Sequence, residues 1–403
     1  MKTIFLIALL FLIGSCKEEK QLNKLDAGWF RAELKVNDSL NLPFTFEVIS
    51  ENELHVINAD EVIEVNDIVY KNDSVYINMP VFEGFLVAEV VDNKLNGSFI
   101  KPGLNRVMPF KAEKDILRFD KGVAAKFNIS GNWETVFSPE AEDESYIAIG
   151  DFEQNGNHVI GTFTTTTGDY RFLEGVLNGN KLKLSTFDGA HAFLFTATVT
   201  DSTMQGNFYS GNHWIEPFVA KRNDSFELPD ANDLTFLKEG YDGITFTFPD
   251  ETGKMVSLND DRFKNKVVLV QIMGTWCPNC LDESKFYADY YKNNTDKDLE
   301  IIALAFEYVA TKAAAFKNIQ RLKENTGISY PVLLAQFGSA SKIKANEKLP
   351  MLNHVLSYPT TIFIDKKGSV RKIHTGFNGP ATGEKFTEFK SEFKSFLDEL
   401  LRE

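Results

Sequence analysis

The residues most able to do chemistry are two cysteines three positions apart, in the run Trp276-Cys277-Pro278-Asn279-Cys280. They follow a continuous apolar run, Val267–Met273, and precede a helical pattern, so the pair should open a helix that follows a buried strand. At a helix N-terminus, free N–H groups and the helix dipole stabilise a thiolate, which makes Cys277 the candidate nucleophile. Cys280 lies one helical turn further on the same side, within reach of Cys277. The spacing therefore predicts reversible dithiol–disulfide chemistry.

Two other uses of a Cys-x-x-Cys pair fit the sequence less well. A zinc site needs two more Cys or His ligands, but the remaining cysteine is Cys16, and His354 and His374 lack ligand spacing. A purely structural disulfide would close a very small loop, which stabilises little. We therefore expect no metal ion and no bound cofactor.

The elements that must position the cysteines lie in the last third of the chain, from about residue 224. Continuous apolar runs there are typical of strands buried on both faces of a sheet, and apolar positions at helical spacing indicate helices. Beyond the cysteines the pattern predicts a strand at Leu299–Phe306, a helix at 311–326, a strand at 331–334, a hairpin of 360–365 and 369–374 turning at Lys367-Gly368, and a helix from about Glu384.

The preceding segment, from about 28 to 223, has a different pattern. Short alternating runs are separated by turn residues such as Asn178-Gly179-Asn180 and Gly211-Asn212. Regular short strands of this kind predict antiparallel sandwich or barrel structure. The clearest runs are 29–36, 44–49, 74–79, Phe85–Val91, 170–177, Lys181–Phe187 and Ala192–Val199.

This all-β segment repeats itself. Gly28-Trp29 opens one copy and Gly131-Asn132-Trp133 the next, and later matches lie at offsets of up to 109 residues. We predict a duplicated antiparallel module made of two related units, 28–116 and 131–223, packed together. Chance similarity among β-rich segments is the alternative. The later matches are Asp92, Gly97, Phe99, Pro109, Phe110 and Ala112 with Asp201, Gly206, Phe208, Pro217, Phe218 and Ala220.

The cysteine run, together with 357–365 (Ser-Tyr-Pro-Thr-Thr-Ile-Phe-Ile-Asp) and Gly368, resembles the thioredoxin superfamily, and more narrowly its TlpA/ResA-like extracytoplasmic thiol-disulfide oxidoreductases. The resemblance covers about 235–403 and implies an α/β thioredoxin-fold domain, a central sheet flanked by helices. It implies that Pro359 is a cis proline facing the cysteines. Backbone groups of Tyr358 would pair with a bound substrate chain. Trp276, Tyr358 and Pro359 are thus the expected substrate-binding residues.

Three features depart from the family pattern. Thioredoxins carry a buried carboxylate six residues before the first cysteine, where this chain has Gln271, so another group must handle protons. Glu283 matches an acid of TlpA/ResA-like proteins and is our candidate; an ordinary surface acid is the alternative. Tyr358 is bulkier than the residue often found there, which would restrict docking. The connection 336–355 is long and predicts an extra helix at about 340–347.

The N-terminus has the pattern of an export signal that ends at a cysteine. A positive Lys2, an apolar run at 4–13 and two small residues are typical of a signal peptide, here 1–15. Its end resembles the lipobox of bacterial lipoproteins, which implies cleavage before Cys16 and lipidation of Cys16. A plain signal peptide with an incidental cysteine is the alternative. Residues 16–27 then form a solvated tether. Lys17, in place of Asp, favours attachment to the outer membrane, either on its periplasmic face or on the cell surface.

Composition limits the partners. The net charge of −14, from 57 acidic and 43 basic residues, argues against nucleic acid, because phosphate binding needs clustered Lys and Arg. With 43% hydrophobic and 25% charged residues, the chain is neither a polytopic membrane protein nor disordered. The expected partners are disulfide-containing exported proteins and a membrane or periplasmic thiol reductant, with membrane contact only through the lipid.

The main hypothesis is an enzyme, an extracytoplasmic protein-disulfide oxidoreductase that reduces exported proteins: Cys277 attacks and Cys280 resolves. A second hypothesis is a thiol-dependent peroxidase with antioxidant activity, although Thr275 precedes Cys277 by two positions rather than the three such enzymes use. A third is a surface binding lipoprotein with an accessory redox domain. Its candidate patch is 168–172 with 187–191, where a simple turn at Asp188-Gly189 is the alternative.

Overall fold

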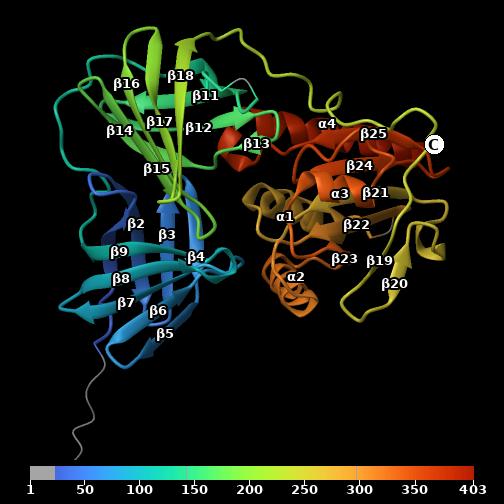
Figure 1. Cartoon of the computed structure of the whole chain (residues 1–403), viewed down its shortest axis with the longest axis horizontal. Coiled ribbons are helices and arrows are strands. Elements are labelled where there is room, and N and C mark those ends of the chain that lie inside the picture. Colours follow the sequence, from blue (N-terminus) through green and yellow to red (C-terminus); the bar gives the residue numbers. More distant parts are fainter. Residues whose placement is uncertain (1–22, 142, 296) are drawn as a thin grey trace, which may run out of the picture.

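The computed structural model describes residues 23–141, 143–295 and 297–403. The expected signal peptide and the lipidation site Cys16 lie outside these residues, as does most of the expected tether. None of the helices formed by the described residues combines the length and the apolar character needed to cross a membrane. Two large antiparallel sheets lie beside a smaller mixed sheet with its helices (Figure 1).

The first sheet is formed by nine strands of the described residues, in the order β4-β3-β2-β1-β9-β8-β7-β6-β5. Each strand pairs with its chain neighbour, except where β1 pairs with β9 instead of β4 with β5. A 3-10 turn, η1 (Pro102–Leu104), joins β8 to β9. The strands are β1 Gly28–Lys35, β2 Asn41–Ser50, β3 Glu53–Asn58, β4 Glu61–Val65, β5 Asp67–Lys71, β6 Ser74–Asn78, β7 Phe85–Val91, β8 Lys94–Lys101 and β9 Arg106–Lys114.

The second sheet has the same design and closes on itself. Its order among the described residues is β11-β10-β18-β17-β16-β15-β14-β12-β13, and an additional pairing of β11 with β12 completes the ring. Aromatic rings fill its interior, with Phe137 and Phe163 each contacting several others. The strands are β10 Gly131–Phe137, β11 Tyr146–Asn155, β12 His158–Thr165, β13 Gly168–Asp169, β14 Leu173–Asn178, β15 Lys181–Phe187, β16 Ala192–Val199, β17 Thr203–Ser210 and β18 Trp214–Arg222.

Two equivalent glycines, Gly97 and Gly206, show why part of the repeat is required by the structure. A Cβ atom on Gly97 would lie 1.9 Å from the Val87 carbonyl oxygen, and one on Gly206 would lie 2.0 Å from that of Thr196. Both sheets therefore need glycine at the same place, where a neighbouring strand comes too close for any side chain.

The expected alignment of the first strands needs a correction. With Gly28 matched to Gly131, the core position after them is Phe30 in one sheet and Trp133 in the other, and both are fully buried. Trp29 lies only partly buried, beside the core position rather than on it. The tryptophans were therefore matched wrongly: a large aromatic ring is what the two copies share there.

The two sheets share a core. Phe187, on β15 of the second sheet, lies 4.4 Å from Phe44 and 5.0 Å from Phe99 of the first, measured between ring centroids. Arg118, in the connection between the sheets, is buried and donates hydrogen bonds to the Ile57 carbonyl of one sheet and to the Glu174 carboxylate of the other. The module therefore folds as a pair of interdependent halves.

The third sheet positions the cysteines. Its order is β23-β22-β21-β24-β25, with the first three strands parallel and the last two antiparallel. Every residue of the two central apolar runs, β21 and β22, is buried, as their continuous hydrophobicity predicted. The strands of this sheet are β21 Val267–Met273, β22 Leu299–Phe306, β23 Val332–Gln336, β24 Thr360–Ile364 and β25 Val370–Thr375. A separate two-stranded sheet pairs β19 Thr247–Pro249 with β20 Met255–Ser257. The helices are α1 Pro278–Lys292, α2 Lys312–Thr326, α3 Lys342–Lys348 and α4 Glu384–Arg402, with 3-10 turns η2 Asp261–Phe263 and η3 Pro380–Thr382.

Local expectations and structure differ at one strand. The run expected at 170–177 begins as β14 only at Leu173, because residues 170–172 lie outside the strand and Arg171 contacts Asp282 on α1. Arg171 takes a left-handed backbone conformation there, with φ of 65°. Its side chain is consequently free to point away from the second sheet.

Arg171 ties the three sheets together. Its guanidinium is buried and donates hydrogen bonds to the carboxylate of Asp282 on α1 and, at 2.5 Å, to that of Glu61 on β4. Asp188, in the turn after β15, lies 3.6 Å from its Nε. Burial alone would lower the pKa of Arg171, but Glu61 and Asp188 outweigh it and hold the pKa above its ordinary value. The cation is therefore fully charged and surrounded by carboxylates from all three parts.

We expect Arg171→Met to loosen the contact between the β module and α1. Breaking a buried ion cluster on one side leaves unpaired buried charges, at a cost of about 3 kcal/mol or more. Hydrogen exchange of the Gly379 and Arg171 amides, both of which donate to Asp169, should accelerate by about 100-fold. Arg262→Met is the matched control, because Arg262 pairs with Glu300 on a partly exposed surface and should cost about 1 kcal/mol or less. Equal protection in wild type and Arg171→Met would contradict this role.

Candidate active site

The two cysteines lie where strand β21 gives way to helix α1. Cys277 is the N-cap residue of α1, and Pro278 takes the first helical position. The Cys277 sulfur accepts a hydrogen bond from the Cys280 backbone N–H at 3.2 Å. Both cysteines are unbonded thiols in this structure. An anionic sulfur at this cap would be stabilised by the same N–H group and by the helix dipole.

The two thiols differ in burial. Cys277 retains 8% of its surface exposed, whereas Cys280 has none. Burial raises the pKa of the Cys280 thiol well above its ordinary value, and the hydrogen bond and charge of Cys277 and the nearby Glu283 carboxylate raise it further. A partner arriving from outside therefore meets Cys277 first, and Cys280 needs help to ionise.

Glu283 lies inside the domain, one turn after Cys280. It is completely buried, so it is not a surface acid. Its carboxylate accepts hydrogen bonds from the Gln271 amide at 2.8 Å, the Thr361 hydroxyl at 2.9 Å and the Tyr287 hydroxyl at 3.2 Å. Burial raises the pKa of Glu283 to about 7, although these hydrogen bonds favour the carboxylate. A group with such a pKa can both take and return a proton near neutrality.

A second buried carboxylate supports the loop before the cysteines. Glu307, at the end of β22, accepts hydrogen bonds from the Thr275 backbone N–H at 2.8 Å and its hydroxyl at 2.7 Å. Burial raises the pKa of Glu307 to about 7 as well. The Trp276 indole N–H donates to the Phe306 carbonyl at 2.9 Å. Sequence reasoning missed Glu307, because an acid at the end of an apolar strand has no motif of its own.

The Tyr358–Pro359 peptide bond is cis and lies beside the cysteines. The Cys277 thiol donates a hydrogen bond to the Tyr358 carbonyl at 3.3 Å. The Tyr358 ring turns inward, 5.6 Å from Trp276 and 5.7 Å from Phe306 between ring centroids, and is 7% exposed. Its bulk therefore lines the site from inside. The structure thus brings together Trp276, Cys277, Cys280, Glu283, Tyr358 and Pro359.

The β module reaches this site through the turn between β12 and β13. The Thr167 carbonyl accepts a hydrogen bond from the Ser357 hydroxyl at 2.9 Å, next to the cis proline loop. The Asp169 carbonyl accepts one from the side chain of Asn279, between the cysteines, at 3.2 Å. At Gly168, with φ of 141°, a Cβ would lie 1.9 Å from the Asn279 amide nitrogen. The Asn279 side chain could shift away from a Cβ, but the backbone angle itself favours glycine, because a residue with a side chain would be strained there.

This contact was not foreseen from the sequence. The stretch 168–172, with 187–191, is the candidate binding patch of the third hypothesis. Its Asp169 contacts α1 through Asn279, whereas Tyr170, Ala190 and His191 line a pocket, so its binding role stays a prediction. Asp188-Gly189 does form the turn after β15, where burial opposes but His191 and Arg171 lower the pKa of Asp188 to about 2. Among the described residues, no group of three or more Cys, His, Asp or Glu side chains is arranged to hold a metal ion.

Comparisons with known proteins show which family this domain resembles. A sequence model of the Redoxin family matches residues 237–389. Thiol-disulfide oxidoreductase ResA of Bacillus subtilis (strain 168) is 30% identical over 140 residues, 35% of this chain and 69% of that protein. Thioredoxin-like protein YneN of the same organism is 29% identical over 140 residues, 35% of this chain and 73% of that protein. A solved thiol-disulfide oxidoreductase from Bacteroides fragilis NCTC 9343 is 19% identical with a TM-score of 0.27, covering 37% of this chain and 99% of that one.

The predicted fold class is confirmed: a duplicated antiparallel β module is followed by an α/β domain of the thioredoxin type. The family match spans the sheet from before β21 to within α4, and so includes both cysteines and the cis proline. The chain therefore belongs to the TlpA/ResA-like thiol-disulfide oxidoreductases of the thioredoxin superfamily.

Proposed function

We propose that this protein-disulfide oxidoreductase works in the cell envelope, where it reduces disulfides of exported proteins through Cys277 and Cys280. The observation that carries the proposal is the unequal placement of the thiols, one at the helix cap with some exposure and the other fully buried behind it. This asymmetry suits one cysteine for attack on a foreign disulfide and the other for release of the product.

The reaction has two exchanges. The Cys277 thiolate attacks one sulfur of the client disulfide; that bond breaks, one client sulfur leaves as a thiolate, and a mixed disulfide joins Cys277 to the client. Cys280 then loses its proton and attacks the Cys277 sulfur, which releases the second client thiolate and forms the Cys277–Cys280 disulfide. The client gains two electrons. A membrane or periplasmic thiol reductant restores the enzyme dithiol by the reverse exchange.

Glu283 is the proposed proton acceptor for Cys280. The second exchange starts from a thiol whose pKa burial has raised, so it requires a base within the domain. Glu283 is close enough for its charge to affect Cys280, and its own pKa of about 7 suits proton transfer at neutral pH. Gln271, at the position of the usual thioredoxin carboxylate, orients Glu283 by donating its amide hydrogen bond.

Trp276, Tyr358 and Pro359 are the proposed docking residues for the client. The loop that contains Tyr358 brings a backbone carbonyl next to the Cys277 sulfur, which suits pairing with an extended client chain. The β module narrows the approach, because its turn at Gly168 packs beside the cysteines. We therefore infer that clients approach from the open side, past Trp276.

The location in the envelope is inferred from residues 1–16. A signal peptide of 1–15 and a lipid on Cys16 would hold the protein at a membrane. The outer membrane is favoured, on either its periplasmic face or the cell surface. The thiol chemistry agrees with this placement, since disulfides persist in exported proteins and seldom in the cytosol.

Cys280→Ser is expected to trap mixed disulfides between Cys277 and client proteins, because the second exchange cannot occur. Cys277→Ser is the matched control and should trap few or none. Non-reducing electrophoresis of both variants, followed by mass spectrometry of the adducts, measures the difference. Equal trapping by the two variants would overturn the assignment of the nucleophile.

Glu283→Gln should slow the second exchange by about tenfold or more while changing the first exchange less. In wild type, Glu283 holds its own proton below about pH 7 and becomes a carboxylate above it, so the rate of resolution should rise through an inflection near pH 7. The variant should lack that inflection. Stopped-flow traces from about pH 5 to pH 9 would follow the mixed disulfide.

Glu307→Gln is the control for this experiment. It neutralises a carboxyl group that is equally buried and has the same raised pKa, but that group binds Thr275 instead of lying beside Cys280. It should keep the inflection. Resolution with the same pH profile in wild type and Glu283→Gln would mean that water takes the proton.

Cys16→Ser tests the anchor. Without the thiol no lipid can be attached, so the variant should appear in the soluble fraction or remain unprocessed. Detergent partitioning and the mass of the mature N-terminus measure this, with Cys280→Ser as a cysteine variant that keeps the anchor. Full membrane partitioning of Cys16→Ser would place the anchor elsewhere.

A further inference from the structure

A pocket of about 530 Å³ lies where the two large sheets meet the thioredoxin-like domain. We call it the junction pocket and define it by Lys101 and Arg106 of the first sheet, Phe193 and Trp214 of the second, and Trp276 and Tyr308 of the thioredoxin-like domain. Trp276 directly precedes the nucleophile Cys277. A ligand seated in this pocket would therefore contact the residue next to the nucleophile, with all three parts of the chain around it, although Cys277 itself does not line the pocket.

The charge of the junction pocket is opposite to that of the whole chain. The chain carries a net charge of −14, yet none of the described residues that line the pocket is Asp or Glu. Neither Lys101 nor Arg106 forms an ion pair with a carboxylate among the described residues. Arg106 thus faces the pocket without a carboxylate partner in the part of the chain that the structure describes, whereas the charges of Asp188 and Glu83 lie near enough to Lys101 to act on its pKa. The unpaired Arg106 favours an anionic ligand.

The cations are positioned differently. The Lys101 ammonium donates a hydrogen bond to the Ala190 carbonyl at 2.5 Å, which holds it against the inner wall. Burial lowers the pKa of Lys101 to about 8, so it still carries its charge at neutral pH. Burial also lowers the pKa of His213, at the same pocket, to about 4, which leaves His213 neutral. Lys101 and Arg106 therefore supply the positive charge.

The remaining walls are aromatic. Trp214 is 50% exposed at the start of β18, so much of its ring is available for contact with a ligand. Phe193 stacks on His191 at 4.2 Å between ring centroids and closes the floor. Trp276 and Tyr308 lie 5.9 Å apart on the opposite wall. Such walls favour an aromatic or large apolar side chain.

We propose that the junction pocket binds the segment of the client polypeptide next to its disulfide and selects clients in which an aromatic side chain neighbours acidic residues. The proposal rests on the proposed function, because it names the substrate class of the same site. A volume of about 530 Å³ accommodates two or three side chains, which suits a short peptide segment. The aromatic side chain packs against Trp214 and Trp276, and the acidic group pairs with Arg106 and Lys101.

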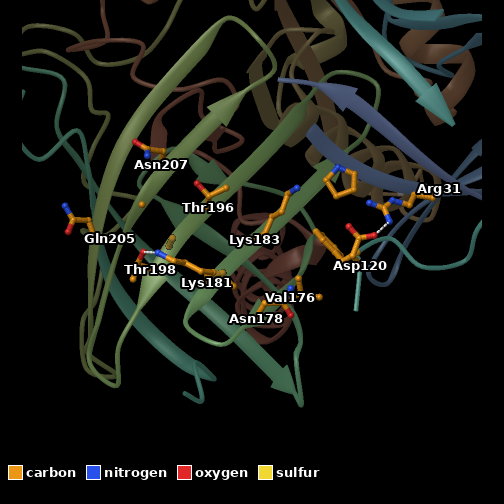
Figure 2. Close-up of a pocket in the computed structure, with 15 residues that line it drawn as sticks. Arg31, Asp120, Val176, Asn178, Lys181, Lys183, Thr196, Thr198, Gln205 and Asn207 are labelled. Carbon is orange, nitrogen blue, oxygen red and sulfur yellow. Dashed lines mark hydrogen bonds and ion pairs between the residues drawn. The ribbon is translucent and has the colours of Figure 1, made fainter. Parts of the chain in front are cut away.

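A second hollow lacks these features. It has a volume of about 440 Å³ and lies between the first and second sheets, where Lys183 lies on the side of the Arg31–Asp120 pair and Lys181 points toward Thr198 (Figure 2). Its Arg31 is already paired with Asp120 at 2.5 Å, and Lys181 donates to Thr198. No cysteine and no tryptophan lines it. In the junction pocket, by contrast, Arg106 forms no ion pair among the described residues, and Trp276, the residue before Cys277, forms part of the wall.

The test compares two synthetic peptide disulfides of equal length that carry Trp beside the cystine, one with flanking Glu residues and the other with flanking Lys residues. Single-turnover reduction by the pre-reduced full chain is followed by stopped-flow, with 2-hydroxyethyl disulfide as a small uncharged substrate. We expect wild type to favour the acidic peptide by about tenfold or more in second-order rate, and about 0.5 M salt to shrink the preference. Arg106→Glu should reduce the ratio of acidic to basic rates by about tenfold. Lys111→Glu, an exposed charge reversal on the same strand β9, should leave that ratio unchanged.

A binding measurement separates recognition from chemistry. In the Cys277→Ser/Cys280→Ser double variant, cysteine-free versions of the two peptides are titrated by calorimetry. The acidic peptide should bind about tenfold more tightly than the basic one, and Trp214→Ala should weaken it by about tenfold while the neighbouring Ile215→Ala does not.

The outcomes are distinguishable. Equal rates for both peptides, with normal reduction of 2-hydroxyethyl disulfide, would overturn the junction pocket and leave the proposed function standing. If none of the three disulfides is reduced, the proposed function itself is overturned. Binding of N-acetyl-tryptophan as tight as that of the acidic peptide would mean a small-molecule site and would also overturn the proposal.

Discussion

The buried guanidinium of Arg171 is the interaction on which the arrangement of the whole chain depends. It comes from the second sheet and meets carboxylates of the first sheet, Glu61, and of helix α1, Asp282. A buried cation without its partners is costly, so the three parts cannot separate without loss of that pairing. Because Asp282 lies two positions after Cys280, the same contact fixes the β module over the start of the helix that carries both cysteines.

The unequal burial of Cys277 and Cys280 arises where strand β21 meets helix α1, and the Arg171 contacts hold the β module beside this junction. The cap of α1 leaves Cys277 slightly exposed and places Cys280 in the core, where Glu283 also lies. The module covers one side of the cap at Gly168 and leaves a cationic, aromatic hollow on the side of Trp276. In this account the β module is part of the substrate site, and it owes its position to charges that make no contact with substrate.

Much of the thioredoxin-like domain could be predicted from the sequence because its signals are local. The uninterrupted runs of β21 and β22 indicated strands buried on both faces, and a cysteine pair after such a strand indicated the helix cap. Gln271 cannot act as a base, and the resemblance to TlpA/ResA-like proteins indicates Glu283 in its place; the structure finds Glu283 buried beside Gln271. Its catalytic role, like those of the cysteines, stays a prediction.

The parts that escaped prediction depend on contacts between distant residues. Arg171 and Asp282 are 111 positions apart, and neither belongs to a motif. Gly168 looked like any turn glycine until its closeness to Asn279 was visible. The match of Trp29 to Trp133 was wrong because sequence similarity follows residue type, whereas the shared feature is a core position that Phe30 and Trp133 occupy. The junction pocket, built from three parts of the chain, has no linear signature either.

The central claim is that Cys277 and Cys280 act as one dithiol that passes two electrons to a client. The most direct measurement adds one equivalent of a peptide disulfide to the reduced protein, quenches with acid, and locates the remaining thiols by alkylation and mass spectrometry. The account predicts that both cysteines become unreactive together, joined in one disulfide, while the peptide is released as two free thiols. A lasting adduct on Cys280 with Cys277 still free, or a peptide disulfide left intact, would contradict it.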